Sequence, residues 1–548
     1  MPSGQYDAIV VGGGHNGLVA AAYLARSGLR TVVCEARHIL GGAAVTEQPF
    51  GPAYHITSLS YVVSLLPPAL VRELRLDRWG YHVYPQGPYF APRADGRYLQ
   101  LPDDRALRAE QIRKFSDKDA DAIDAWDGWI GQLAGVLGPL LAEIPPKVGS
   151  RRPADVIAQL RLLHRLRRLD TRGAVEATRL FSMSISDLLD DFFESDAVKG
   201  VLAVSGVIGT WAGPRSPGTA YVMAHHHIGD LGEGKVGTWG FPRGGMGAVT
   251  QALASAARSF GAELRAGARV EHISARDGVV TGVVLEGGDE LTAPIVVTTA
   301  HPAISFLRLV DRGDLPADFV TDIERWRTRS GTVKVNLVVD RLPEFVSRPG
   351  FDPDVHGGTI VLADSLDDLE AAFQDAVSGR PSSLPFADIC IPSVFDDSLA
   401  PPGHHVVSMF TQWVPHEWVR GHGDDELTAY ADRVVARMET VAPGFTDSVL
   451  HRQVIGTREM ETEYGLVGGN IFHGELSPSQ LFHTRPAAGY ADLRTPVWGL
   501  YQAGSATHGG GGVTGIPGRN VVRQIASDRR RDRLRSRLVS GRGVRPGR

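Results

Sequence analysis

Tyr6-Asp-Ala-Ile-Val-Val-Gly-Gly-Gly-His-Asn-Gly17 is the stretch of this 548-residue sequence that decides its fold. The β-branched run ending at Val11 predicts a short buried strand, which leads directly into a G-x-G-x-x-G motif. Residues 18–27 carry apolar side chains at helical spacing, and a second strand, residues 31–35, ends on an acid. The order strand, glycine motif, helix and strand predicts the first βαβ unit of a Rossmann-like fold.

Each part of this pattern suits the binding of a dinucleotide. Gly12 permits a tight turn, Gly14 lets the backbone approach a pyrophosphate, and Gly17 lets helix and strand pack closely. His15 and Asn16 begin the helix, whose free N–H groups and positive dipole end face the phosphates. Glu35 has the spacing at which such folds place a carboxylate on the adenosine ribose. The alternative is a glycine-rich turn without a ligand, and the complete pattern favours the nucleotide site.

Composition is that of an ordinary globular enzyme. Hydrophobic residues make up 43% of the chain and charged residues 22%, and this length predicts two or more domains. The net charge of −5 gives no indication of a nucleic-acid partner. The two cysteines, Cys34 and Cys390, lie far apart without a C-x-x-C motif. This excludes a disulfide framework, a cysteine zinc site and a redox-active dithiol.

The sequence predicts a cytoplasmic protein. No apolar run reaches the roughly 18 residues of a spanning helix, and a first strand by Tyr6 leaves no room for a signal or transit peptide. Residues 155–169 form a basic amphipathic pattern, which can make a peripheral contact with an anionic membrane. The favoured alternative is a solvated helix packed on its own domain. The residues of this pattern are Ile157, Leu160, Leu163 and Leu166 opposite Arg161, Arg165, Arg167 and Arg168.

A second glycine pair follows the ribose acid. Ala36 and Arg37 lead to Gly41-Gly42, which gives another stretch of bare backbone near a pyrophosphate, with Arg37 as a cation. Here the sequence resembles the flavoproteins of the phytoene desaturase, carotenoid isomerase and amine oxidase group, in which an arginine and a Gly-Gly pair follow the acid. The resemblance implies FAD rather than NAD. Only one dinucleotide fingerprint is present, so a second bound NAD(P) has no evident site.

Two later segments resemble the other cofactor-binding motifs of this group. Residues 242–304 return to α/β character, with a hairpin turn at Asp277-Gly278, and the resemblance places Val270 near the adenine end and Ala300 near the cofactor. Residues 497–520 predict a strand, a glycine loop and a helix. Ser505 stands where many relatives carry an aspartate. The resemblance places the following residues of this segment at the flavin: Gly504, Ser505, Gly512, Val513 and Thr514.

The expected fold class is α/β and α+β, with a discontinuous Rossmann-like FAD-binding domain and an inserted mixed substrate domain. The expected boundaries are residues 1–65, 236–304 and 485–528 for the FAD-binding domain, and 66–235 and 305–484 for the substrate domain. Residues 529–548 are rich in arginine, and we expect a solvated, disordered tail. A weak contact of this tail with anionic surfaces is the alternative.

Within that group, the chain is similar to the family of pyridine nucleotide-disulfide oxidoreductase domain-containing protein 2. Despite that family name, the cysteine count excludes disulfide exchange. The resemblance implies FAD-dependent oxidation or desaturation of an apolar or conjugated small molecule, with hydride transfer to flavin N5. A redox-neutral flavin isomerase, an amine oxidase-like enzyme and a non-catalytic FAD-bound interaction protein remain open. The likeness rests on His225-His226, Gly244 to Gly247, Gly469 to Leu476 and Gly510 to Val513.

Several histidines invite a functional interpretation. His508, His473 and Glu475 are candidate catalytic groups near the flavin. Residues 225–227 are three consecutive histidines, which do not share one helix face and have no acid or cysteine at ligand spacing. We therefore expect no metal site there, and expect these histidines to line a cavity or to pack in the core.

Overall fold

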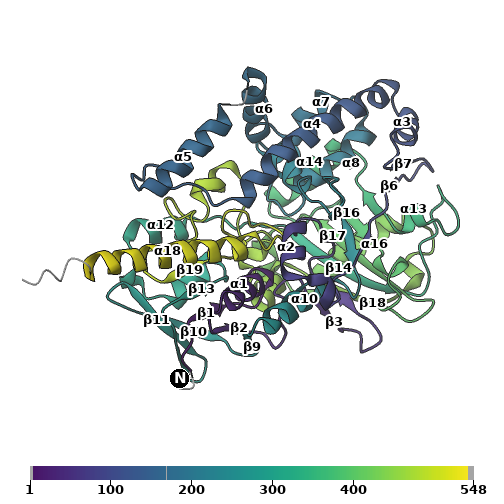
Figure 1. The fold of residues 1–548 in the computed structure, drawn as a ribbon. Coiled ribbons are helices and arrows are strands. Elements are labelled where there is room, and N and C mark those ends of the chain that lie inside the picture. Colours follow the sequence, from purple (N-terminus) through teal and green to yellow (C-terminus); the bar gives the residue numbers. More distant parts are fainter. Residues whose placement is uncertain (1–3, 168–169, 541–548) are drawn as a thin grey trace, which may run out of the picture.

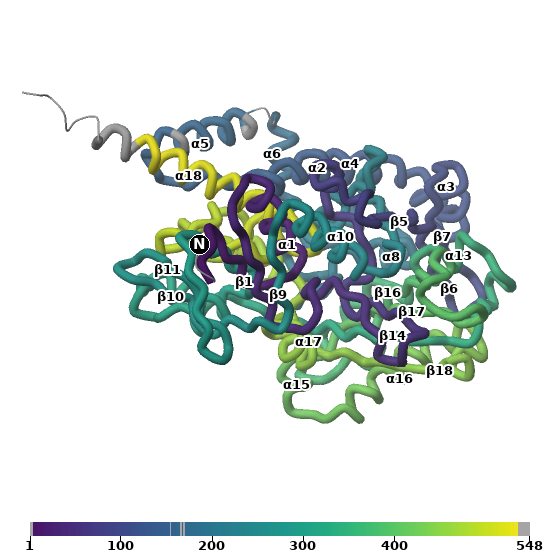
Figure 2. Tube along the Cα trace, turned by 60° about the horizontal axis from the view of Figure 1, so that its bottom comes forward, coloured from purple at the N-terminus to yellow at the C-terminus, as the bar shows by residue number. Residues whose placement is uncertain are grey.

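The computed structural model describes residues 4–167 and 170–540. Figure 1 shows a small parallel sheet low in the molecule, a larger mixed sheet beside it and a layer of helices above both. The combination of parallel and mixed sheets with helices confirms the predicted mixed fold, a Rossmann-like domain joined to a substrate domain. The tube in Figure 2 shows that the first and last parts of the chain meet in the Rossmann-like region.

The five-stranded sheet is parallel throughout and has β1 at its centre. Its order is β19-β13-β1-β2-β9. Parallel sheets are buried on both faces, and every residue of β1, β2, β13 and β19 is buried accordingly. The strands come from three distant segments of the chain: β1 (Ala8–Val11), β2 (Thr31–Cys34), β9 (Glu263–Arg265), β13 (Val296–Thr298) and β19 (Leu500–Gln502).

Helix α1 (His15–Arg26) is the centre of the packing around this sheet. It contacts α10 (Met246–Ser259) and α18 (Ile516–Ser540), which come from the other two segments. Small buried residues between Leu18 and Ala25 let the three helices approach one another closely. The nearby antiparallel sheet of β10 (Val270–Arg276), β11 (Val279–Leu285) and β12 (Glu290–Thr292) contains the hairpin predicted at Asp277-Gly278, where both residues have positive φ.

The seven-stranded sheet has one apolar face and one face with polar residues. On β14, Val333, Val335 and Leu337 pack with Val434 and Met438 of α16 (Asp424–Val441). The alternating residues of β14 point to the opposite face, since side chains along a strand alternate. The order is β18-β14-β17-β16-β15-β6-β7, with β6 (Tyr89–Pro92), β7 (Tyr98–Leu101), β14 (Thr332–Val339), β15 (Thr359–Leu362), β16 (Phe386–Cys390), β17 (His405–Gln412) and β18 (Val449–Ile455).

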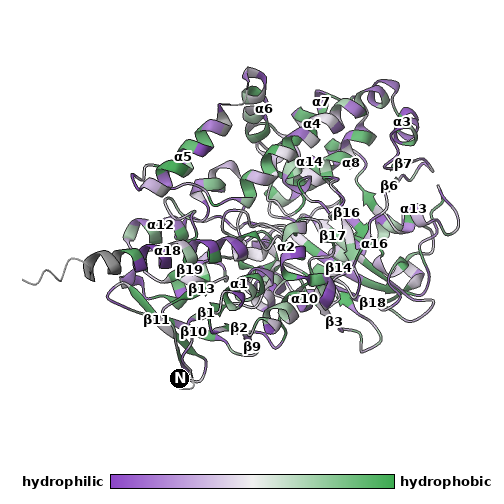
Figure 3. Cartoon of the chain, in the orientation of Figure 1, coloured by the Kyte–Doolittle hydropathy of each residue, from purple (hydrophilic) through white to green (hydrophobic). Residues whose placement is uncertain are grey.

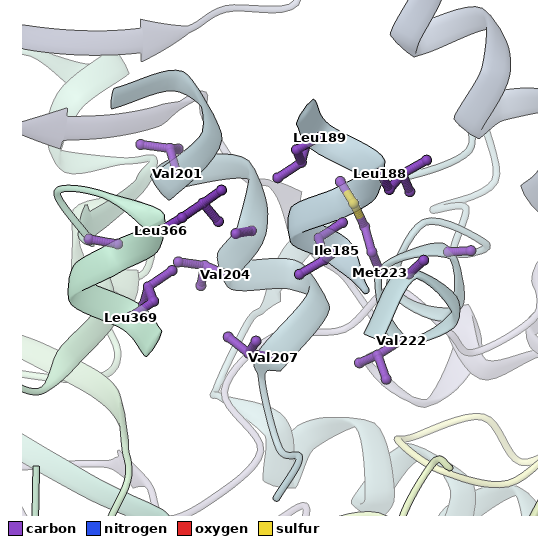
Figure 4. Close-up of a cluster of buried hydrophobic side chains, with 14 of the residues drawn as sticks. Ile185, Leu188, Leu189, Val201, Val204, Val207, Val222, Met223, Leu366 and Leu369 are labelled. Carbon is purple, nitrogen blue, oxygen red and sulfur yellow. The ribbon is translucent and has the colours of Figure 1, made fainter. Parts of the chain in front are cut away.

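A layer of helices covers one side of the molecule and has its own core. Figure 4 shows Leu188, Val204, Met223 and Leu369 converging from four different helices. Serine and aspartate N-caps begin several of these helices, as at Ser184, whose hydroxyl accepts from the Asp187 N–H at 3.0 Å. The layer contains α3 (Arg105–Arg113), α4 (Asp117–Ala142), α5 (Pro153–Leu166), α6 (Thr171–Ser182), α7 (Ile185–Asp190), α8 (Asp196–Val207), α9 (Thr219–His226) and α14 (Leu366–Val377).

Shorter elements connect these layers. They are β3 (Thr46–Glu47), β4 (Ile56–Thr57), α2 (Pro68–Leu74), β5 (Val83–Pro85), β8 (Gly240–Pro242), α11 (Pro302–Ile304), α12 (Ala317–Glu324), α13 (Pro353–His356), α15 (His416–Gly421) and α17 (Thr457–Tyr464). Among the described helices, none combines the length and the apolar character that crossing a bilayer requires.

The expectation of a disordered tail is wrong for residues 529–540. Helix α18 continues through them to Ser540 and projects from the body of the molecule in Figures 1 and 2. Its buried first half is anchored by Asp528, whose carboxylate accepts from Arg494 at 2.6 and 2.8 Å. Once a helix is nucleated, each further residue costs little, and arginine is a good helix former. Residues 541–548 lie outside the described part of the chain.

The helix predicted at residues 155–169 is present as α5, but its apolar side does not pack on the domain. Ile157, Leu160 and Leu163 are all exposed, Leu160 at 58%. In Figure 3, hydrophobic and hydrophilic segments alternate along α5. The expectation that this helix buries its apolar stripe on its own domain is therefore wrong, because no other part of the described chain covers it. Arg168 lies outside the described residues.

We predict that Leu188→Ala lowers the free energy of unfolding by about 2–5 kcal/mol, because it leaves a cavity in the helical core shown in Figure 4. Leu188 is 1% exposed, whereas Leu160 is 58% exposed. The same substitution at Leu160 is the matched control and should change stability by less than about 0.5 kcal/mol. Urea denaturation followed by circular dichroism measures both, and equal effects would contradict the packing described for α7.

Candidate cofactor and substrate site

A cavity of about 890 Å³ has walls from both large sheets. This is near the upper end of the range of roughly 300–1,000 Å³ typical of ligand sites. One wall is formed by the strand ends and glycine turns of the five-stranded sheet, and the other by one face of the seven-stranded sheet. Residues of these walls include Gly12, Gly14, Glu35 and Ala300 on the first side, and Thr332, Lys334, Asp388 and Phe410 on the second.

The glycine motif leaves bare backbone at the cavity wall. A Cβ added to Gly17 would clash with the carbonyl oxygen of Gly12, so α1 begins directly on the turn. A Cβ added to Gly42 would come within 3.2 Å of the Gly14 Cα, which shows how closely the two glycine segments approach. Backbone N–H groups at a helix start, free of side chains, form an anion-binding cradle. Gly17 and Gly41 support this cradle from behind, whereas Gly12, Gly14 and Gly42 line the cavity.

Glu35 lies at the end of β2 and faces the cavity. Its carboxylate accepts from the Gly13 N–H at 2.6 Å and from the Arg37 N–H at 2.8 Å. A carboxylate offers about four acceptor positions, so positions remain for the two hydroxyls of a ribose. Ala36 and Val270 line the same region.

The Arg37 guanidinium is held in place by protein groups. It pairs with Glu47 at 2.7 Å, lies 4.4 Å from the centroid of the Tyr464 ring and reaches the Gly42 carbonyl oxygen at 3.3 Å. Glu47 in turn accepts from the Tyr464 hydroxyl at 2.8 Å. Arg37 lines the cavity, so this network fixes a cation at the wall.

Five cavity-lining residues carry buried polar atoms without a hydrogen-bond partner in the described structure. These atoms are His15 Nε2, Asn16 Oδ1, Ser64 Oγ, His301 Nε2 and His473 Nδ1. Burial lowers the pKa of His15 and of His473 to about 4, so both imidazoles are neutral near pH 7. Buried polar groups are normally paired, and a polar ligand in the cavity would supply the partners.

The C-terminal glycine loop completes the wall. Ser505 accepts from Asn16 Nδ2 at 3.3 Å, and Gly512 and Val513 line the cavity just before α18 begins. Gly512 has a φ of +94°, and an added Cβ would lie 2.8 Å from Leu65 Cδ1, so both backbone conformation and space require glycine. Gly504 and Thr514 lie outside the cavity lining, and the Thr514 hydroxyl donates to the Gly509 carbonyl at 2.9 Å.

The structure places one of the three candidate catalytic residues at the cavity and the other two outside its lining. His473 lines the cavity, whereas His508 and Glu475 do not. Burial lowers the pKa of His508 to about 4, and its Nε2 donates to the Leu140 carbonyl at 3.0 Å. Glu475 accepts from Arg329 at 2.7 and 3.0 Å. Their contacts are with the protein's own groups, so we assign no catalytic role to His508 or Glu475.

The three consecutive histidines have separate partners. His225 Nε2 donates to the Gly511 carbonyl at 2.9 Å, and His226 Nδ1 donates to the Ser205 carbonyl at 2.8 Å. His226 lines the cavity and His225 is buried. Within residues 4–167 and 170–540, no three histidine, cysteine, aspartate or glutamate side chains converge as metal ligands.

The polar residues of the second wall were not among those predicted from the sequence. Tyr61, Lys334 and Asp388 line the cavity, and the Tyr61 hydroxyl donates to Asp388 Oδ1 at 2.9 Å. The available signal was the alternation of Thr332-Val-Lys334-Val-Asn336 in a strand otherwise rich in valine. On a central strand whose sheet is covered on both faces, a lysine that alternates with valines does not face solvent. Such a lysine therefore indicates that its face of the sheet borders a cavity.

Comparison with known proteins shows the family to which the chain belongs. The family pattern described as flavin containing amine oxidoreductase matches residues 17–518. The rat protein named pyridine nucleotide-disulfide oxidoreductase domain-containing protein 2 is 40% identical over 546 residues, which cover 96% of this chain and 94% of the relative. Prolycopene isomerase 2 of an Oncidium hybrid cultivar is 24% identical over 96% of this chain and 84% of its own. These matches confirm the resemblance expected from the sequence.

A solved structure agrees in fold. Cyclohexylamine oxidase from Brevibacterium oxydans superposes with a TM-score of 0.57 at 18% identity, over 95% of this chain and 99% of the other. At this identity the likeness concerns the arrangement of the chain alone.

We predict that Glu35→Ala weakens FAD binding by about 1.5–3 kcal/mol, because hydrogen bonds to a charged acceptor are lost and two backbone N–H groups lose their partner. Flavin content after dialysis, measured by absorbance, gives the result. Glu263→Ala is the matched control, because Glu263 lies on neighbouring β9 and accepts from the Tyr6 hydroxyl outside the cavity. Unchanged flavin occupancy in Glu35→Ala would show that Glu35 does not hold the ribose.

Proposed function

Because this chain belongs to the family of flavin containing amine oxidoreductases, we propose that FAD binds along the wall of the five-stranded sheet and a largely apolar substrate along the seven-stranded sheet. The chain is an FAD-dependent oxidoreductase acting on a small molecule. The observation that carries the proposal is one cavity with both walls: a glycine cradle with Glu35 on one side, and aromatic side chains on the other.

The residues of the first wall fit FAD. Glu35 offers acceptors, the glycines offer N–H groups, and the partnerless atoms of His15 and Asn16 need a polar ligand. We propose that the following residues hold the cofactor directly or support those that do: Gly12, Gly14, His15, Asn16, Gly17, Glu35, Ala36, Arg37, Gly41, Gly42, Val270, Ala300, Gly504, Ser505, Gly512, Val513 and Thr514. FAD, when bound, supplies hydride-accepting chemistry, so the protein needs to position substrate and exclude water.

The remaining wall suits an apolar substrate. Ile208, Trp239, Phe410, Ile471 and Phe472 contribute apolar surface to it. The relative named prolycopene isomerase acts, by its name, on a polyene, and this supports an apolar or conjugated substrate for the present chain. We propose oxidation or desaturation of such a molecule. His473 stays a candidate for contact with the reacting groups, because it lines the cavity with a free nitrogen.

Two other activities have specific support. The isomerase relative supports a redox-neutral conversion, and the match to the family of flavin containing amine oxidoreductases supports amine oxidation. A non-catalytic FAD-bound protein is the remaining alternative. These activities differ in whether substrate removes the absorbance of oxidised flavin, and in which substrate does so.

We predict that anaerobic titration with a conjugated polyene or another apolar dehydrogenation substrate bleaches the oxidised flavin absorbance, whereas NADPH and simple primary amines do not. The reason is the apolar second wall and the single dinucleotide fingerprint. Free FAD at the same concentration is the control. Bleaching by amines alone would favour amine oxidation. Turnover of a polyene without bleaching would favour isomerisation. If no substrate class causes bleaching or turnover, the result would favour a non-catalytic protein.

We also propose that the protein is cytoplasmic and that α5 brings it to an anionic membrane surface. Val156, Ile157, Leu160 and Leu163 form an exposed apolar stripe, since residues three and four apart share a helix face. The exposed arginines beside it are Arg151, Arg152, Arg161 and Arg167. Anionic lipid matches this charge, at roughly 1 kcal/mol for each basic residue near the surface. We therefore propose that this stripe contacts a bilayer surface.

We predict that the wild-type protein sediments with vesicles containing phosphatidylserine, and that Leu160→Glu reduces the bound fraction at least about tenfold. The substitution removes apolar contact and adds repulsion from the lipid charge. Leu107→Glu is the control, because Leu107 is exposed on α3 at a comparable 54%. Equal binding of the two variants, or equal binding to neutral vesicles, would contradict a role for α5.

A further inference from the structure

Three neighbouring strands place Lys334, Phe410 and Asp388 in one row. In the sheet register, Lys334 of β14 lies opposite Phe410 of β17, and Asp388 of β16 lies opposite the same Phe410. Residues directly opposite on paired strands direct their side chains to the same face of the sheet. All three residues line the cavity. The row is therefore fixed by backbone pairing, and its two outer members are ionisable.

Asp388 is a buried carboxylate with spare hydrogen-bonding capacity. It is 5% exposed, and in the described structure its hydrogen bond is the one from the Tyr61 hydroxyl to Oδ1, at 2.9 Å. Oδ2 has no hydrogen-bond partner there. A carboxylate oxygen at a cavity wall that accepts from no protein group can accept a hydrogen bond from a ligand. Because Asp388 lines the cavity, a substrate can reach it.

Lys334 supplies the complementary donors. It is 1% exposed, its Nζ donates to the Ser408 hydroxyl, and Nζ lies 4.4 Å from the centroid of the Tyr61 ring. An ammonium has three N–H donors, of which Ser408 takes one. The Tyr61 ring also stacks on Phe410, with centroids 6.2 Å apart. Lys334, Tyr61 and Asp388 thus form one polar patch in a wall that is otherwise aromatic.

The charges in this patch balance each other. Burial lowers the pKa of Lys334 to about 7 and raises the pKa of Asp388 to about 6, while the attraction between the two opposes both shifts. A substrate group with a full charge would leave one buried charge without compensation, which is strongly unfavourable. A neutral group that both donates and accepts meets Asp388 and Lys334 together, and a hydroxyl is the smallest such group.

We infer that the substrate is an apolar molecule with a hydroxyl group, which donates to Asp388 and accepts from Lys334. This inference rests on the proposed function, because it concerns the substrate wall of the same cavity. The inference favours alcohols over hydrocarbons, because hydrocarbons have no group that can hydrogen-bond to Asp388 or Lys334. It also favours alcohols over amines and carboxylates, because those groups carry a charge. Tyr61 positions the Asp388 carboxylate and need not contact the substrate.

The test uses the FAD-containing protein and four ligands of similar chain length: decan-1-ol, decyl methyl ether, decylamine and decanoate. Binding is followed by thermal shift and by perturbation of the flavin spectrum. We predict that decan-1-ol binds about 10- to 100-fold more tightly than the ether, which accepts a hydrogen bond but cannot donate one. Asp388→Asn and Tyr61→Phe should each reduce the affinity for the alcohol about tenfold or more and leave the ether unaffected.

The controls separate a folding defect from a binding defect. Asp432→Asn makes the same chemical change on the surface of the molecule, where Asp432 pairs with Arg452, and should bind the alcohol as the wild type does. Flavin content and melting temperature show whether each cavity variant is folded. Tyr61→Phe, a smaller change, provides the test if Asp388→Asn fails to fold.

Equal binding of alcohol and ether, no binding of the alcohol, or alcohol binding that does not depend on Asp388 or Tyr61 would overturn the inference. Tightest binding of decylamine with dependence on Asp388 would overturn it in favour of an ammonium group. Failure of the proposed function has a different signature: the purified protein would lack FAD, or no substrate would change its flavin, whatever the selectivity among the four ligands.

Discussion

The contact between Gly17 and the Gly12 carbonyl oxygen is the constraint on which the site depends. No side chain fits between the start of α1 and the end of β1, so the helix begins against the turn and its first residues, His15 and Asn16, line the cavity. Helices α10 and α18 then pack on α1, although one begins at residue 246 and the other at residue 516. The cavity wall on the five-stranded sheet therefore exists only when three distant segments of the chain have assembled on this one helix.

The sequence was sufficient to predict those elements whose backbone conformation is determined by neighbouring residues in the chain. The first βαβ unit, the hairpin at Asp277-Gly278 and the strand, loop and helix near the C-terminus all follow from short patterns of glycine, β-branched and apolar residues. Each of these patterns specifies backbone conformation within about ten residues. The structure adds the pairing between them, such as β19 joining β13 at the edge of the first sheet.

The second wall could not be predicted in the same way. Alternation on β14 suggests a strand with one face in solvent, yet every residue of the strand is buried. Only the register that brings Lys334, Phe410 and Asp388 together shows that the polar face lines a cavity. The placement of His508 and Glu475 outside the cavity lining has a related reason: position in the sequence does not determine side-chain direction, and both form hydrogen bonds with groups outside that lining. The exposure of Leu160 likewise depends on what the rest of the fold leaves uncovered.

The electrostatic character of the cavity follows from these placements. Burial keeps His15 and His473 neutral, and Lys334 and Asp388 offset each other, so these side chains contribute little net charge. Positive charge at the first wall comes from the Arg37 guanidinium, which lines the cavity, and from the backbone at the start of α18, next to Gly512 and Val513. Behind that wall, the buried Arg485 donates to the Ser505 carbonyl at 3.0 Å. Burial lowers the pKa of Arg485 only to about 10, so it stays protonated at neutral pH. Under the proposed function, a charge-balanced aromatic wall opposite the glycine cradle suits transfer of a hydride from an uncharged molecule, which needs no ionised acid or base at the reacting carbon.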